Sequence, residues 1–241
     1  TEPTEDCKSD QATLAYASPC LFDHYDRPIL ALINFCPNKV FRCDSTTGEL
    51  NCGGIEETDK FNHMKDLASH ELAHALGFNM DRSWSWRDTD GKTPRTPRLN
   101  DGSVAHGTFT CLDGTRNHQP QIANTTLRIG RPSTEKTTKP HFKIVTPTVA
   151  AVAKAHYGCS TEIGAELENQ GDGTSCFGSH WEEKTMLGEL MTASQPVYGA
   201  RKVVSAFTLA AFADMGFYKV DMSLAKPLPW GYNAGCDFVN K

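Results

Sequence analysis

The strongest constraint on the fold of this 241-residue chain is the segment 69–78, which carries the pattern His-Glu-x-x-His among helix-forming residues. Four residues make about one helical turn, so His70 and His74 lie on one face of the expected helix and can bind one metal ion. Glu71 is next to His70, where its carboxylate can hold and deprotonate a water molecule on that metal. The pattern predicts zinc-assisted hydrolysis, with a peptide bond as the favoured substrate.

We expect this helix to span residues 60–76. Apolar residues recur along it and predict a buried side, and Gly77 follows at the point where a helix can end in a left-handed residue. The alternative is an ordinary half-buried helix on which two histidines and a glutamate fall at this spacing by chance. The apolar segment 28–36 predicts a buried strand, and segments 148–157 and 204–215 predict two further helices.

A catalytic zinc ion usually has three protein ligands and leaves one position for water. No glutamate occurs between Glu71 and Glu135, which argues against the ligand arrangement of thermolysin-like enzymes. The compact metzincin pattern His-Glu-x-x-His-x-x-Gly-x-x-His fits through Gly77. Its last position, however, is occupied by Met80, a poor zinc ligand. The third ligand must therefore lie elsewhere in the chain.

Five histidines after residue 100 are candidates for the third ligand: His106, His118, His141, His156 and His180. The first three lie in segments rich in glycine, threonine, proline and charge, and the fourth lies in a predicted amphipathic helix. His180 is followed eleven residues later by Met191. Metzincins have a methionine in a tight turn beneath the zinc site, shortly after the third histidine. His180 with Met191 is therefore the favoured choice, and His141 and His106 come next.

Taken together, these motifs resemble those of leishmanolysin and its relatives, the metzincins whose third histidine lies beyond a long insertion. The resemblance covers about two-thirds of the chain, in motifs that keep their order. It includes the strand before the active-site helix, the third-ligand region, the methionine turn and the segment after the catalytic core. The matching segments are 14–20, 27–34, 153–159, 178–182, 189–191, 214–218 and 229–236.

The resemblance implies an α+β metzincin fold with two lobes that flank an active-site cleft. Residues 1–78, with the active-site helix, would form the upper lobe, and residues 79–241 the lower lobe. A long insertion, residues 81–142, would separate the second zinc histidine from the third. The helix at 204–215 would pack under the methionine turn.

The implied function is a zinc-dependent endopeptidase with one catalytic Zn²⁺ ion. His70, His74 and His180 would be its ligands, Glu71 the general base and Met191 the residue of the methionine turn. The alternative is a structural or adhesion protein that keeps the metzincin fold with little or no proteolysis. Cleavage of an unfolded protein that stops when a chelator is added would distinguish the two.

The composition limits the partners of the chain. Its formal net charge is −5 and it has no long basic stretch, so protein or peptide substrates are expected and nucleic acid is not. No apolar run has the length of a transmembrane segment. The first residues have no signal-peptide character, so a secreted form would be mature or trimmed. A larger precursor or an extracellular assembly would be a further partner of the chain.

Nine cysteines that form no zinc-binding Cys-x-x-Cys pairs predict a disulfide framework and an extracellular or cell-surface location. The resemblance implies a Cys159–Cys236 disulfide. Cys43 and Cys52 can close the small loop between them. An odd number of cysteines cannot all pair within the chain. Asn124 begins an Asn-Thr-Thr glycosylation acceptor on an expected surface loop.

Overall fold

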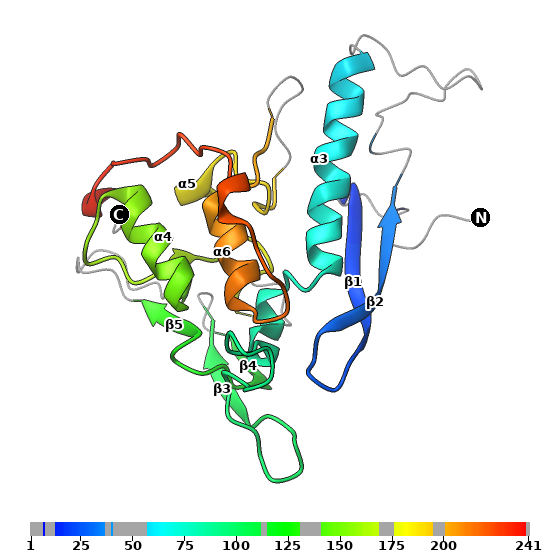
Figure 1. Cartoon of the computed structure of the whole chain (residues 1–241), viewed down its shortest axis with the longest axis vertical. Helices are drawn as coiled ribbons and strands as arrows, with labels where there is room; N and C mark the ends of the chain where they lie inside the picture. Colours follow the sequence, from blue (N-terminus) through cyan, green and yellow to red (C-terminus); the bar gives the residue numbers. More distant parts are fainter. Residues whose placement is uncertain are drawn as a thin grey trace. The chain divides into compact units, whose positions relative to one another are not determined.

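The computed structural model describes residues 7, 13–36, 40, 57–111, 115–130, 141–168, 176–194 and 201–239. These residues belong to two compact units. The combination of helices with small antiparallel sheets confirms the expected α+β class (Figure 1). The first unit comprises Thr1–Asp23, Arg27–Gly77 and Pro196–Lys202, and the second comprises His24–Asp26, Phe78–Gln195 and Val203–Lys241.

In the first unit, one long helix packs on a two-stranded antiparallel sheet. Strand β1 (Ala15–Phe22) pairs with β2 (Pro28–Phe35), and α3 (Glu57–Ala75) lies along both strands (Figure 1). Arg201 binds the Asp66 carboxylate of α3 through Nε and Nη2, both at 2.8 Å. This ion pair joins the helix to a segment more than a hundred residues later in the chain.

The strand predicted at residues 28–36 is present as β2, but the prediction that it is buried is wrong. Leu30 and Leu32 are 60% and 52% exposed. A helix can cover only one face of a two-stranded sheet, and α3 is the helix that packs on this one among the described residues. The run of apolar residues therefore predicted a strand correctly, but such a run does not require that both faces of the strand are covered.

Helix α3 begins at Glu57 and ends at Ala75, so it starts three residues before the predicted position. Gly77 follows with a φ of 104°, a conformation that favours glycine. Its N–H donates to the carbonyl of His74 at 2.9 Å, and a Cβ at this position would lie 3.2 Å from Cγ of Pro28. The helix thus ends one residue after His74, and the chain turns at Gly77, three residues after this histidine.

The second unit contains a three-stranded antiparallel sheet in the order β5–β6–β7, formed by Leu127–Gly130, His141–Ile144 and Ala165–Glu166. A separate hairpin pairs β3 (His106–Thr110) with β4 (Arg116–Pro120). Four of these strands lie in or overlap the segment 81–142, which the sequence predicts as a turn-rich insertion. The sequence did not predict the β3–β4 hairpin, because its mostly polar residues show no alternation of apolar and polar positions. The hydrogen bonds between the two backbones leave no pattern in the sequence.

The helices of the second unit are α4 (Pro147–Tyr157), α5 (Glu183–Met186), α6 (Ala206–Asp214) and α7 (Cys236–Val239), with 3-10 helices η1 (Met80–Ser85) and η2 (Met222–Leu224). The predicted helices at 148–157 and 204–215 correspond to α4 and α6. No helix in the described part of the chain is long and apolar enough to cross a bilayer.

Helices α4 and α6 pack together, and a carboxylate at the end of one caps the start of the other (Figure 1). Asp214, the last residue of α6, accepts hydrogen bonds from the N–H groups of Thr148 and Val149 at 2.8 and 3.0 Å. It also accepts one from the Thr148 hydroxyl at 2.6 Å. The first turn of a helix leaves N–H groups unpaired, so this buried carboxylate supplies a cap that the α4 segment lacks.

Large aromatic side chains fill the core of the second unit. Trp181 is fully buried, packs edge-on against Phe78 at a centroid distance of 5.3 Å, and lies 6.5 Å from Phe207 of α6. Its indole N–H donates to the Thr208 hydroxyl at 3.0 Å. The residue directly after His180 is therefore anchored to α6 by both packing and a hydrogen bond.

Three disulfides join described cysteines: Cys7–Cys36 in the first unit, and Cys111–Cys176 and Cys159–Cys236 in the second. The last is the pair that the family resemblance implies. Cys20 is exposed and has no disulfide partner in the described part of the chain. The candidate loop-closing pair Cys43 and Cys52 lies outside the described residues.

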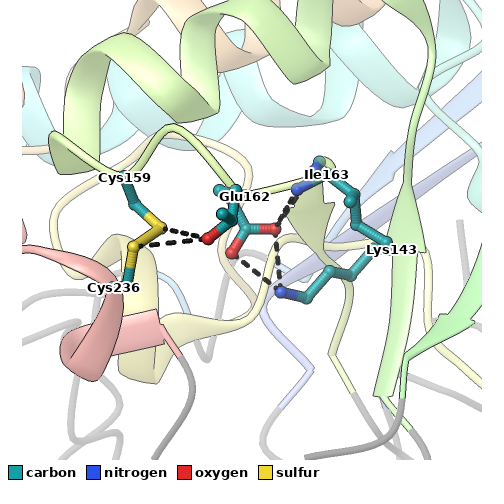
Figure 2. The surroundings of a disulfide bond; sticks show 7 residues. Lys143, Cys159, Glu162, Ile163 and Cys236 are labelled. Atoms are coloured by element: carbon teal, nitrogen blue, oxygen red, sulfur yellow. Dashed lines mark hydrogen bonds and ion pairs between the residues drawn. A yellow bond between two sulfur atoms is a disulfide. The ribbon is translucent and has the colours of Figure 1, made fainter.

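A buried ion pair lies beside the Cys159–Cys236 disulfide (Figure 2). The Lys143 ammonium of β6 donates to both carboxylate oxygens of Glu162, at 2.9 and 3.0 Å. The same carboxylate accepts the backbone N–H of Ile163 at 2.8 Å. The disulfide and the ion pair together hold the loop after α4 against α7 and the sheet.

Replacing Asp214 by alanine is expected to lower the free energy of unfolding by about 2 kcal/mol, because buried N–H donors at the start of α4 lose their acceptor. Chemical denaturation of the metal-free protein measures this change. Asp237→Ala, at an exposed position of α7, is the matched control and should change stability by less than about 0.5 kcal/mol. Equal effects of the two substitutions would show that the cap contributes nothing.

Candidate functional site

The two histidines of the motif face each other on α3. Nε2 of His70 lies 3.1 Å from Nε2 of His74, and both side chains are buried. Their rings are nearly perpendicular, with a centroid distance of 4.7 Å. Two imidazole nitrogens bound to one tetrahedral zinc ion at the usual bond length are about 3.3 Å apart. The helix therefore presents the two nitrogens at a separation that suits a shared ion.

Glu71 is buried beside this pair, with 3% of its surface exposed. Its Oε2 atom has no hydrogen-bond partner among the described residues. Burial raises the pKa of the Glu71 carboxyl from 4.5 to about 7. A carboxyl with a pKa near neutrality can both accept and release a proton at neutral pH.

His180 and Met191 belong to the second unit, where the backbone joins their segments directly. The N–H of Trp181 donates to the carbonyl of Met191 at 2.9 Å, and Trp181 forms a parallel bridge with Thr192. Met191 is fully buried. Within this unit, the segments that contain His180 and Met191 therefore lie side by side. The sequence had linked them only by their spacing of eleven residues.

The turn before Met191 is built around Glu189, which belongs to the matching segment 189–191 but to which the sequence assigned no role of its own. Its side chain is completely buried. Oε1 accepts hydrogen bonds from the Ser205 N–H and hydroxyl at 3.1 and 3.0 Å and from the Thr208 hydroxyl at 2.6 Å, and Oε2 accepts the Met191 N–H. Its place two residues before Met191 was the only sequence signal for this role.

The remaining candidate histidines lie in other settings of the second unit. His106 and His118 are exposed on the β3–β4 hairpin, where their rings stack at a centroid distance of 5.6 Å. His141 begins β6. His156 of α4 faces the Trp230 carbonyl at 2.9 Å, and burial lowers the pKa of its imidazole. Its side chain is half-buried.

Asn124, the glycosylation candidate, lies at the start of a turn over residues 124–126 with an exposed side chain. The turn precedes β5, and the Asn124 carbonyl accepts a hydrogen bond from Arg128 at 2.9 Å. Asn124 is therefore at the surface of the second unit, whereas Thr126, the hydroxyl residue of the acceptor sequence, is fully buried.

Comparison with known proteins adds to this geometry. A family model described as Leishmanolysin matches residues 96–241. The leishmanolysin-like peptidase of Caenorhabditis elegans is 33% identical over 95% of this chain. The chain belongs to the leishmanolysin family. Its similarity to the leishmanolysin-like peptidase of Drosophila melanogaster is 34% over 94% of the chain, and to the ciliated left-right organizer metallopeptidase of Xenopus laevis 32% over 96%.

This leishmanolysin family member spans between about a quarter and a third of the length of these relatives: 32%, 30% and 26% respectively. The matches to these relatives span nearly the whole chain, whereas the family model begins at residue 96. That model therefore includes most of the segment 81–142, whose assignment as an insertion stays a prediction.

The residues on α3 fit a zinc site by their chemistry. Two imidazole nitrogens face each other at a ligand-like separation, and a buried carboxyl oxygen next to them has no hydrogen-bond partner within the described residues. Neutral imidazole is among the preferred ligands of Zn²⁺, and a carboxylate beside the metal can act as a general base on a metal-bound water. The metal expected in a metallopeptidase family is thus compatible with this helix.

Burial raises the pKa of the Glu189 carboxyl, partly offset by its hydrogen bonds from Thr208, Met191 and Ser205. The raised pKa favours the protonated form in the folded state. Stability that this carboxyl contributes is therefore present below its ordinary pKa of 4.5 and is lost as the pH rises.

We expect Glu189→Gln, which does not titrate, to gain stability relative to the parent as the pH rises from 4.5 towards 8. Urea unfolding of both metal-free proteins across that range measures the difference. A difference that is constant with pH, or that grows in favour of the parent, would contradict the assigned direction.

Proposed function

We propose that this chain forms the catalytic part of a zinc-dependent endopeptidase, with His70, His74 and His180 as the ligands of one Zn²⁺ ion. The observation that carries this proposal is the facing pair of Nε2 atoms on α3 beside the buried Glu71 carboxyl. Membership of the leishmanolysin family supports it, because the relatives named above are called peptidases or metallopeptidases.

Bound Zn²⁺ would act as a Lewis acid on the scissile carbonyl and would lower the pKa of water. Glu71 would be the general base. Its raised pKa and unpartnered Oε2 suit a group that accepts a proton from water and later delivers it to the nitrogen of the leaving amine. The helix supplies this base from the residue next to a ligand, so that one rigid element positions both.

Met191 would form the methionine turn beneath the third ligand. The hydrogen bond from the Trp181 N–H to its carbonyl supports this role, because it ties the turn to the residue after His180. Glu189 stabilises the turn by binding α6 through Ser205 and Thr208. The predicted helix at 204–215 would thus support the methionine turn.

The finer architecture follows from the family resemblance. Residues 1–78 and 79–241 would be the two catalytic lobes that flank an active-site cleft, with residues 81–142 as an insertion. Protein or peptide substrates would bind there in extended form, as backbone pairing with a strand allows for any sequence.

We also infer an extracellular or cell-surface location. Three disulfides among the described residues favour an oxidising compartment, and the exposed Asn124 is suited to carry a glycan. A larger precursor or an extracellular assembly remains part of this proposal.

The variant Glu71→Gln is expected to retain zinc and to lose about 10²- to 10⁴-fold in peptide hydrolysis, because the amide cannot accept the proton. Cleavage of unfolded casein, with zinc content determined by elemental analysis, measures both quantities. Asp59→Asn on the same helix is the matched control and should cleave at the parental rate. Parental activity in Glu71→Gln would exclude Glu71 as the base. A parent protein that does not cleave casein would instead favour the structural or adhesion alternative.

His180→Ala is expected to lower both the zinc content and the activity, because a site with two protein ligands holds zinc weakly. His118→Ala, at an exposed position of β4, is the control and should leave both unchanged. An unchanged zinc content in His180→Ala would move the third ligand to His141 or His106.

A further inference from the structure

The imidazole of His180 lies against a carboxylate that neither the motif nor the family resemblance singles out. Its Nδ1 atom is 2.5 Å from Oε1 of Glu168. The Glu168 side chain is 11% exposed and that of His180 is 23% exposed. A contact at this distance between a ring nitrogen and a largely buried carboxylate is a charge-assisted hydrogen bond, which holds the ring more firmly than a neutral one.

The backbone around this contact fixes the two residues opposite each other. The N–H of Glu168 donates to the carbonyl of His180 at 3.0 Å, and the N–H of Gly178 donates to the carbonyl of Glu168 at 3.0 Å. The neighbouring residues Leu167 and Trp181 form an antiparallel bridge. Glu168 therefore belongs to a strand-like pairing with the histidine segment, and its position does not depend on the side-chain contact alone.

Gly178 leaves the space that the Glu168 side chain occupies. A Cβ atom at residue 178 would lie 1.8 Å from Oε1 and 2.3 Å from Cδ of Glu168. Any other residue at this position would displace the carboxylate from the imidazole. The glycine two residues before His180 is thus explained by the close approach of the carboxylate.

The other carboxylate oxygen of Glu168, Oε2, is buried and has no hydrogen-bond partner in the described part of the chain. A buried polar atom without a partner costs stability, and such costs are usually retained where a side chain serves another purpose. At this position the cost of the buried Oε2 atom is offset by the hydrogen bond between Oε1 and the His180 imidazole.

We infer that Glu168 is a positioning residue that holds the His180 imidazole with its proton on Nδ1 and its Nε2 lone pair available to a metal ion. This inference rests on the proposed function, in which His180 is the third zinc ligand. An acceptor on one ring nitrogen fixes the tautomer and the orientation of the ring, and metal-binding histidines commonly have such a partner. Gly178 contributes by leaving room for the carboxylate.

The test compares zinc affinity among variants of the whole chain by competition with a chromophoric chelator. Glu168→Ala should bind zinc about 10- to 100-fold more weakly than the parent. Glu168→Gln should lose less, because its amide oxygen accepts the same hydrogen bond without the charge. Asp214→Ala, which removes the cap of α4, should lower stability and leave zinc affinity unchanged.

Gly178→Ala provides an independent arm of the experiment. It should weaken zinc binding in the parent and have little further effect in the Glu168→Ala background, because both changes remove the same contact. If Gly178→Ala does not fold, the two Glu168 variants and the Asp214→Ala control still decide the matter.

The outcomes separate this inference from the proposed ligand set. If His180→Ala weakens zinc binding and Glu168→Ala does not, the positioning role is wrong and the ligand assignment stands. If neither variant changes zinc affinity, both are wrong. A parallel loss in Glu168→Ala and Asp214→Ala would mean that zinc binding follows stability, and would also overturn the inference.

Discussion

The second unit depends on the buried carboxylate of Glu189. It accepts hydrogen bonds from Ser205 and Thr208 at the start of α6 and from the backbone of Met191. Thr208 in turn accepts the indole N–H of Trp181, the residue after His180. Because a buried carboxylate without partners would be strongly destabilising, the helix, the turn and the histidine segment must come together for the unit to fold.

This arrangement is a short polar network inside an aromatic core, and its members come from distant parts of the sequence. A second buried carboxylate, that of Glu168, contacts the imidazole of His180 and occupies the space that Gly178 leaves open. In the proposed function, one histidine segment is therefore held from two directions, by the turn through Trp181 and by Glu168. On α3, by contrast, helical spacing alone positions two histidines and the base.

Features that depend on residues close together in sequence were predicted, and features that depend on contacts between distant residues were not. The helices α3, α4 and α6 were predicted because their apolar periodicity is local. The β3–β4 hairpin was missed because its mostly polar strands show no such pattern. The burial predicted for β2 was wrong because exposure depends on what covers a strand. Glu189 and Glu168 were missed because a glutamate at a core position has no local signature, and only its distant partners make it acceptable there.

The sequence by itself determined the candidate chemistry: the spacing of His70, Glu71 and His74 decides which side chains share a helical face, and helical geometry needs no further information. It also determined the family, through motifs that keep their order along the chain. Only the tertiary structure decided which polar side chains support these residues. Asp214 caps α4, Glu189 binds α6 and Glu168 faces His180 because folding brings together residues far apart in sequence, and burial makes each of these hydrogen bonds costly to lose.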